Sequence, residues 1–172
     1  MVLGLRAARI SVAASILAAV SLGTPALSRP APPDTVEAME RNVASRVNEI
    51  RAAHGRGRLT RDAVLARVAR RHACWLSAHG TLSHQGPSGE TVGDRVRAGG
   101  KSFRTVAENL AQSVNVPDPV AAAIDGWMRS PGHRENILRE DVTETGVGIC
   151  RVGAAGYYVT QVFLRPAVAR PR

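Results

Sequence analysis

The segment Ser130-Pro131-Gly132-His133 places an imidazole at the start of a predicted short helix. Ser130 can act as the N-cap, and Pro131 suits the first helical position because its φ is already fixed. His133 then falls at the third helical position, where the positive end of the helix dipole favours the neutral imidazole. A neutral imidazole accepts a hydrogen bond or binds a metal ion, so His133 is a candidate site residue.

Two more residues stand out for their chemistry. His84 follows a predicted helix in Leu82-Ser83-His84, and Glu108 lies in Ala107-Glu108-Asn109-Leu110-Ala111, which we expect to be extended. An imidazole and a carboxylate are the usual groups for general acid–base work. For Asn109 we expect a structural role, in which its side chain bonds local backbone.

Apolar periodicity predicts the elements that must position these residues. Spacings of three and four residues predict helices over about 36–54, 60–79, 90–98 and 118–127, with a short helix starting at 130. Runs of β-branched and apolar residues predict strands near 103–111, 146–152 and 157–164, the last two joined as a hairpin through Gly153-Ala154-Ala155-Gly156. Three short strands with helices before and between them indicate an α+β domain.

The first 28 residues have the composition of an export signal. Arg6 and Arg9 form a basic start, residues 10–22 are apolar, and Ala26-Leu27-Ser28 suits signal peptidase. The apolar run is short for a membrane span, and an uncleaved amphipathic anchor is the alternative. We expect a signal peptide at 1–28, a Pro-rich leader at 29–33, one domain at 34–166 and a tail at 167–172. The mature chain is then secreted or periplasmic, with no transmembrane segment.

Two cysteines, Cys74 and Cys150, remain after the predicted cleavage. An even number of cysteines in an exported chain favours one disulfide. The alternative is two small buried residues that are never bridged.

The formal net charge of +9 comes from 23 basic and 14 acidic residues, and 22 of the basic residues are Arg. Nucleic-acid binding calls for basic residues clustered beside aromatic ones, whereas here they are scattered and aromatics are few. We therefore expect no nucleic-acid partner. A basic surface still allows attraction to anionic lipid or cell-wall polymer.

Several motifs, taken in order, resemble the CAP superfamily of cysteine-rich secretory, antigen 5 and pathogenesis-related proteins, and more narrowly its exported bacterial branch with SCP-like domains. The matching segments cover nearly all of the mature chain. They are Val47–Arg51, Arg71–Ala73, Ser83-His84, Asp94–Gly99, Ala107–Ala111, Trp127–Leu138, Thr145–Gly148 and Tyr157–Phe163.

This resemblance implies a three-layer α-β-α sandwich with a small central antiparallel sheet and a shallow cavity lined by two His and two Glu. His84 corresponds to the first His, Glu108 to the first Glu and His133 to the second His. The second Glu of the family falls near Ser130, where this chain has no carboxylate. Glu135 is close in sequence, but nothing aligns it with the family position.

Two imidazoles and one carboxylate suit Zn²⁺ or a similar divalent ion, with His84 and His133 as ligands and water in the remaining positions. A carboxylate beside a histidine also fixes its tautomer. The alternative is a hydrogen-bonded polar cluster that needs no metal. For His72 we expect a packed helix residue and not a ligand.

Two functions from different classes follow, beside a default role as a structural or signalling protein that acts only through protein contacts. The first is a secreted, monomeric, non-enzymatic module that binds a lipid or cell-envelope ligand at a cavity containing His84, Glu108, Ser130 and His133. The second is a metal-assisted hydrolase or peptidase in which His84 and His133 hold the ion and Glu108 is the candidate catalytic base. The missing partner carboxylate weakens the second.

Overall fold

The computed structural model describes residues 35–167. The predicted signal peptide, the Pro-rich leader and residues 168–172 of the predicted tail lie outside the described residues, so these boundaries stay predictions. No helix within residues 35–167 combines the length and the hydrophobicity that crossing a membrane requires.

The described chain forms five α-helices and four β-strands. The helices are α1 (Val36–Ala53), α2 (Ala63–His79), α3 (Val92–Ala98), α4 (Pro119–Arg129) and α5 (Pro131–Leu138). The strands are β1 (Thr60–Arg61), β2 (Phe103–Val114), β3 (Glu144–Val152) and β4 (Gly156–Pro166).

The four strands form one sheet in the order β1-β3-β4-β2. Strand β4 pairs antiparallel with β3 and with β2, which confirms the expected antiparallel core of the sheet and the β3–β4 hairpin. Strand β1 adds a short parallel pair, Thr60 with Glu144 and Arg61 with Thr145. The helix expected from residue 60 therefore begins three residues later, because Asp62 caps it by accepting from the Leu65 backbone N–H at 2.8 Å.

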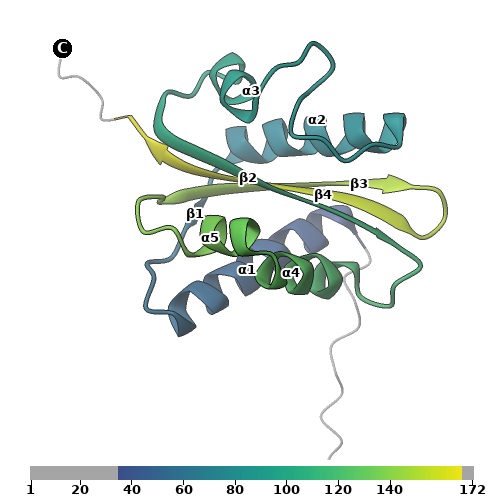
Figure 1. The fold of residues 1–172 in the computed structure, drawn as a ribbon, viewed down its shortest axis with the longest axis horizontal. Helices are drawn as coiled ribbons and strands as arrows, with labels where there is room; N and C mark the ends of the chain where they lie inside the picture. Colours follow the sequence, from purple (N-terminus) through teal and green to yellow (C-terminus); the bar gives the residue numbers. More distant parts are fainter. Residues whose placement is uncertain (1–34, 168–172) are drawn as a thin grey trace, which may run out of the picture. The chain divides into compact units, whose positions relative to one another are not determined.

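The helices lie in two layers, one on each face of the sheet, so the chain is the α-β-α sandwich that the resemblance implies (Figure 1). Helices α2 and α3 cover one face, and α1, α4 and α5 cover the other. Both faces of β4 are therefore buried: Phe163 packs with the α1 layer, whereas its neighbours Val162 and Leu164 pack with the α2 layer. This alternation follows from the two-residue period of a strand.

Glycines let α2 approach β3 unusually closely. A Cβ at Gly146 would overlap the backbone of Leu65 and Ala66, and one at Gly148 would overlap the backbone of Ala69 and Arg70. The motif Thr145-Gly146-Val147-Gly148 is therefore a packing requirement of this sandwich.

Cys74 of α2 and Cys150 of β3 form the predicted disulfide, across 76 residues of sequence. The covalent bond joins α2 to the same strand that the two glycines bring close to it. A cross-link over so long a loop stabilises the fold mainly by restricting the unfolded chain.

The edge of β3 beyond its short pairing with β1 is covered by a side chain. Glu40 of α1 is buried, and its carboxylate accepts the Ile149 backbone N–H at 3.0 Å. Arg70 of α2 donates to the same carboxylate from Nε at 2.8 Å and also from a terminal nitrogen. The two helical layers are thus joined around this edge of the sheet.

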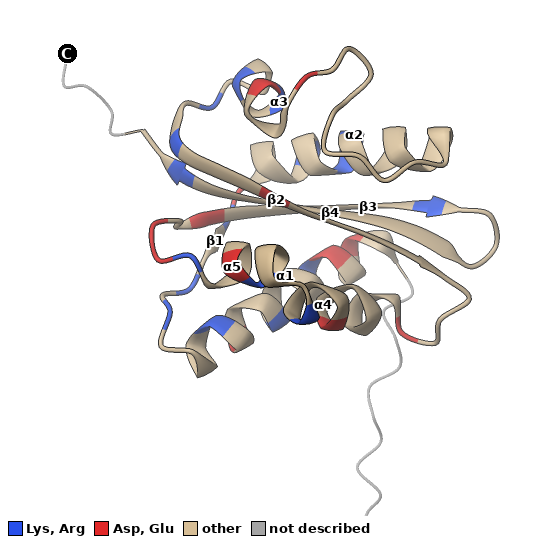
Figure 2. Ribbon diagram, in the orientation of Figure 1, with Lys and Arg blue, Asp and Glu red and all other residues tan. Residues whose placement is uncertain are grey.

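Charged residues are distributed over both helical layers and the strand ends (Figure 2). Basic positions lie among acidic ones on α1, α3 and α4, whereas α2 carries basic positions alone. The figure thus shows the same scatter that the sequence indicates.

We expect Gly148→Ala to lower the free energy of unfolding by roughly 3 kcal/mol, because the added methyl group meets α2 backbone that cannot move aside easily. The matched control is Gly126→Ala in α4, where a Cβ meets nothing within 4 Å and the change should stabilise by up to ~1 kcal/mol. Urea unfolding measures both. Equal stability of the two variants would contradict the close packing of α2 on β3.

Candidate functional site

The carboxylate of Glu108 on β2 is the centre of the candidate site. Its side chain is only 2% exposed, yet it lies on the outer strand of the sheet, at the edge opposite β1. Oε1 is 2.9 Å from Nδ1 of His84, and Oε2 accepts from Arg95 at 2.6 Å. Both carboxylate oxygens therefore have charged or polar partners, as a buried carboxylate requires.

Arg95 of α3 is a site residue that sequence reasoning missed. Its guanidinium also donates to the backbone carbonyls of His84 at 3.1 Å and Glu90 at 3.0 Å. Helix α3 is fixed at its start by a capping box between Thr91 and Asp94, which sets the direction of Arg95. One guanidinium thus holds both the carboxylate and the loop that carries His84. The only sequence signal was its place in the Asp94–Gly99 segment.

His84 lies in the loop after α2 and remains 60% exposed although it bonds a buried carboxylate. A carboxylate accepts hydrogen bonds, so Nδ1 carries the proton and donates it to Glu108. In the neutral ring this leaves the lone pair on Nε2, at the exposed part of the side chain. Glu108 thus fixes both the tautomer and the orientation of His84.

His72 on α2 packs behind this pair, as expected for a helix residue in the interior. Its Nε2 donates to the Ser83 carbonyl at 2.9 Å and lies 4.0 Å from Glu108 Oε1, and its ring stacks on Trp75. Burial lowers the pKa of His72 below its usual value, and this outweighs the opposite influence of Glu108. A neutral His72 supports the loop of His84 without adding charge.

Helix α5 approaches the same strand from the other layer. The side chain of Asn109 donates to the His133 carbonyl at 3.0 Å and accepts from Asn136 at 2.9 Å. Asn136 also donates to the Glu108 carbonyl at 3.3 Å. The role of Asn109 is therefore structural, as expected, but it bonds a distant helix instead of local backbone.

His133 is the third helical residue of α5 and half-buried. Burial lowers the pKa of His133, and the neighbouring His84 lowers it further. The neutral ring expected from the sequence is thus favoured by desolvation and by a second imidazole. The structure brings His84 and Glu108 into contact and places His133 within electrostatic reach of His84.

Ser130 occupies the N-cap position of α5, but its side chain makes no capping hydrogen bond. Within residues 35–167, neither a carboxylate nor another polar partner contacts its hydroxyl. Ser130 therefore stands one turn before His133 and outside the hydrogen-bonded cluster around Glu108.

A hollow of about 510 Å³ lies behind the cluster, between α2, α3 and the loop at 87–90. Its walls include His72 and Arg95, together with Trp75 and Pro87. His72 and Arg95, which lie on the inner side of Glu108, therefore border a cavity next to α2, whereas His84 lies on the exposed side.

The donor set does not match that of a resident zinc ion. Such sites have three or four protein ligands, and the described residues contain no group of three His, Cys, Asp or Glu arranged for a metal. Glu108 is already engaged by Arg95, whose positive charge opposes a second cation. The remaining candidate ligands for a metal ion are therefore the two imidazoles of His84 and His133.

Residues 44–163 match the family described as "CAP: Cysteine-rich secretory protein family". The chain belongs to this family. Membership of the CAP family explains the order of the helices and strands. It also explains why the motifs around His84, Glu108 and His133 resemble those of the family.

Similar proteins come from bacteria. The uncharacterized protein YkwD of Bacillus subtilis is 33% identical over 122 residues, which cover 71% of this chain and 46% of that protein. The structure of an extracellular protein containing an SCP domain from Bacillus anthracis is 34% identical, with a TM-score of 0.65, and covers 80% of this chain and 45% of that one. This CAP chain thus spans less than half the length of these two relatives.

An outer surface protein from Borrelia burgdorferi shares the fold at 21% identity, with a TM-score of 0.70 over 77% of this chain and 96% of that one. This likeness supports the CAP architecture alone. It shows that a chain of similar extent adopts the same sandwich.

We predict that the stability of this CAP domain falls between pH 7 and pH 5. Since burial lowers the pKa of His72 and His133 in the folded chain, the unfolded chain binds protons at a higher pH. The stabilisation by neutral imidazoles is complete above the ordinary pKa of 6.5 and is lost as the pH falls through the lowered folded values.

Urea unfolding at pH 7, 6 and 5 measures this loss. His72→Gln should show a shallower fall than the wild type, and Gly126→Ala, which changes no titratable group, should keep the wild-type slope. Equal slopes for His72→Gln and the wild type would contradict the assignment.

Proposed function

We propose that this chain is an exported, non-enzymatic CAP module that binds a lipid or cell-envelope ligand at the surface presented by His84. The observation that carries the proposal is the state of Glu108. Its two oxygens are engaged by Arg95 and His84, and its side chain is almost fully buried. A carboxylate in this state orients an imidazole and has no free oxygen for a substrate.

Export is supported by three independent features. The N-terminal sequence has the composition of a signal peptide, the Cys74–Cys150 disulfide suits an oxidising compartment, and a similar structure from Bacillus anthracis is described as extracellular.

The exposed Nε2 of His84 is the best-oriented polar atom of the site. Because Glu108 holds the opposite nitrogen, Nε2 accepts a hydrogen bond in a fixed direction, and a ligand hydroxyl or amide N–H would supply one. His133, with its lowered pKa, provides a second neutral ring nearby. The neutral imidazole of His133 beside the oriented ring of His84 favours a polar group of the ligand that can donate a hydrogen bond.

Hydrolysis, the alternative from the sequence, lacks a free base in this arrangement. A general base must reach the proton it removes, and Glu108 is enclosed by its own partners. His84 could accept a proton at Nε2, but no serine or cysteine nucleophile contacts it among residues 35–167, and Cys74 and Cys150 are bonded to each other.

We expect the mature wild-type protein to retain envelope lipid or glycan adducts when it is incubated with a bacterial envelope extract and analysed by native mass spectrometry. His84→Ala should lose most of these adducts because the oriented acceptor is removed. Gln85→Ala, an exposed neighbour in the same loop, is the matched control and should retain them.

The same preparations serve to test hydrolysis of a casein or peptide substrate with and without added zinc. We expect no turnover above that of heat-treated protein. Sustained hydrolysis that disappears in His84→Ala would overturn the non-enzymatic assignment in favour of the metal-assisted hydrolase.

The sequence-based expectation of a divalent ion is tested by loading, and the two imidazoles of His84 and His133 support only weak loading. We therefore expect zinc added to the untagged protein to be removed by dialysis, leaving well under one equivalent by elemental mass spectrometry. One full equivalent that is retained by the wild type and lost in His84→Ala would contradict this and establish a resident metal.

A further inference from the structure

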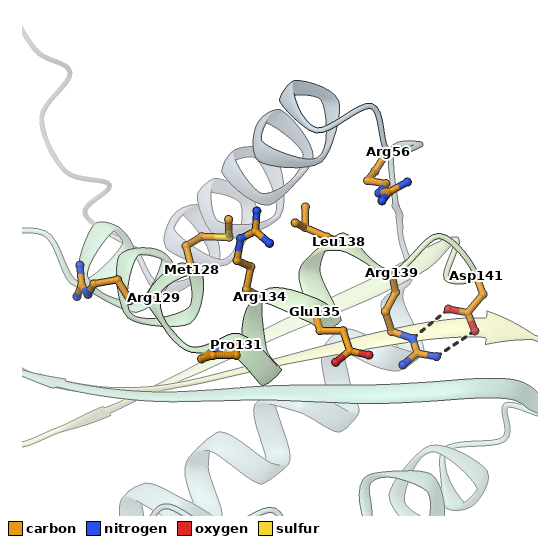
Figure 3. Close-up of a pocket in the computed structure, with 9 residues that line it drawn as sticks. All are labelled: Arg56, Met128, Arg129, Pro131, Arg134, Glu135, Leu138, Arg139 and Asp141. Atoms are coloured by element: carbon orange, nitrogen blue, oxygen red, sulfur yellow. Dashed lines mark hydrogen bonds and ion pairs between the residues drawn. The ribbon is translucent and has the colours of Figure 1, made fainter.

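Helix α5 has two different faces. His133, Asn136 and Ile137 face β2 and the core. The spacing of three and four residues places Pro131, Arg134 and Leu138 together on another face. That second face borders a hollow of about 660 Å³ between α5, the end of α4 and Arg56, which follows α1; we name it the α5 hollow (Figure 3).

Arg134 is a free cation of this hollow. Its side chain is exposed, and within the described part of the chain it has neither an ion pair nor a hydrogen bond. Figure 3 shows its guanidinium beside the side chain of Met128, whereas Glu135 points to a different side and Arg129 points away. A guanidinium that lies along apolar carbon and lacks an acidic partner has its donors available for a ligand.

Among the other charged residues of the hollow, Arg139 and Asp141 pair with each other, and the carboxylate of Glu135 acts electrostatically on Arg139. Arg139 makes two hydrogen bonds to Asp141, at 2.9 Å and 3.2 Å (Figure 3). Arg56, on the far side of the hollow, pairs with the exposed Glu140, and its Nε is buried without a partner in the described residues. An anion in the hollow would therefore meet Arg134 from one side and Arg56 from the other.

The walls between these two cations are apolar. Leu138 projects between Arg134 and Arg56, Met128 lies beside Arg134 on the side away from Arg56, and Pro131 lies at the start of the helix (Figure 3). The volume falls within the range of ~300–1,000 Å³ that is usual for small-ligand sites. A small inorganic anion would leave the apolar walls without contacts.

We propose that the α5 hollow binds a phosphate ester that carries an apolar substituent, with Arg134 as the principal anchor and Arg56 as the second. A tetrahedral phosphate presents oxygens toward two guanidinium groups that approach from different sides, whereas the two oxygens of a carboxylate suit a single guanidinium. The substituent lies against Met128 and Leu138. This site is separate from the surface of His84, and its occupancy does not depend on that surface.

Three probes test the proposal on the mature protein: dibutyl phosphate, inorganic phosphate, and phosphatidylcholine vesicles with or without phosphatidylglycerol. Titrations followed by NMR should show dibutyl phosphate shifting the amide signals of α5 and binding more tightly than inorganic phosphate. Arg134→Gln should weaken this binding about tenfold or more, the expected loss of a charge-assisted contact. Arg41→Gln, which removes an exposed arginine of α1 and thus the same net charge, should change it less than about twofold.

The vesicles identify the source of the ester. Sedimentation with phosphatidylglycerol vesicles that depends on Arg134 supports a lipid head group, and binding of dibutyl phosphate alone supports a soluble ester. Arg134→Lys keeps the positive charge but lacks the planar pair of donors, so we expect it to bind more weakly than the wild type. An unchanged circular dichroism spectrum of this variant shows that the loss comes from the contact and not from misfolding. Absence of binding to any probe, equal affinities for dibutyl and inorganic phosphate, or equal effects of Arg134→Gln and Arg41→Gln would overturn the proposal.

Discussion

Three other parts of the chain meet strand β2 at Glu108, whose carboxylate is buried. It lies on the outer strand β2, accepts from Arg95 of α3 and holds His84 in the loop after α2, while its own backbone carbonyl accepts from Asn136 of α5. A buried carboxylate is costly unless it is paired and hydrogen-bonded. These elements therefore have to be in place together.

The opposite edge of the sheet also has a buried glutamate that is paired with an arginine. There Glu40 of α1 accepts the Ile149 backbone N–H and is held by Arg70 of α2. At each edge one buried glutamate pairs with an arginine of the α2–α3 layer, and so the two helical layers are joined around the sheet. The difference lies in exposure: the Glu108 edge presents an oriented imidazole to solvent, whereas the Glu40 edge caps a backbone N–H.

Much of this was predictable from sequence because it depends on local patterns. The β3–β4 hairpin, the start of α4 near residue 118 and the disulfide followed from strand and helix patterns and from the cysteine count. The two-residue strand β1 was missed because pairing with β3 determines it, and Thr60 and Arg61 alone carry no strand signal. Arg95 was missed for a related reason. The sequence does not distinguish it from the other arginines among the 22, because its burial arises only when α3 packs over β2.

The central claim is that the Glu108–Arg95 pair is coupled in the folded protein, and a double-mutant cycle measures this directly. Glu108→Gln and Arg95→Met should each lower the free energy of unfolding by roughly 3–5 kcal/mol, because each leaves a buried partner uncompensated. The double variant should be more stable than the sum of the two losses predicts, with a coupling energy of at least about 1.5 kcal/mol. A coupling energy below about 0.5 kcal/mol would contradict the account.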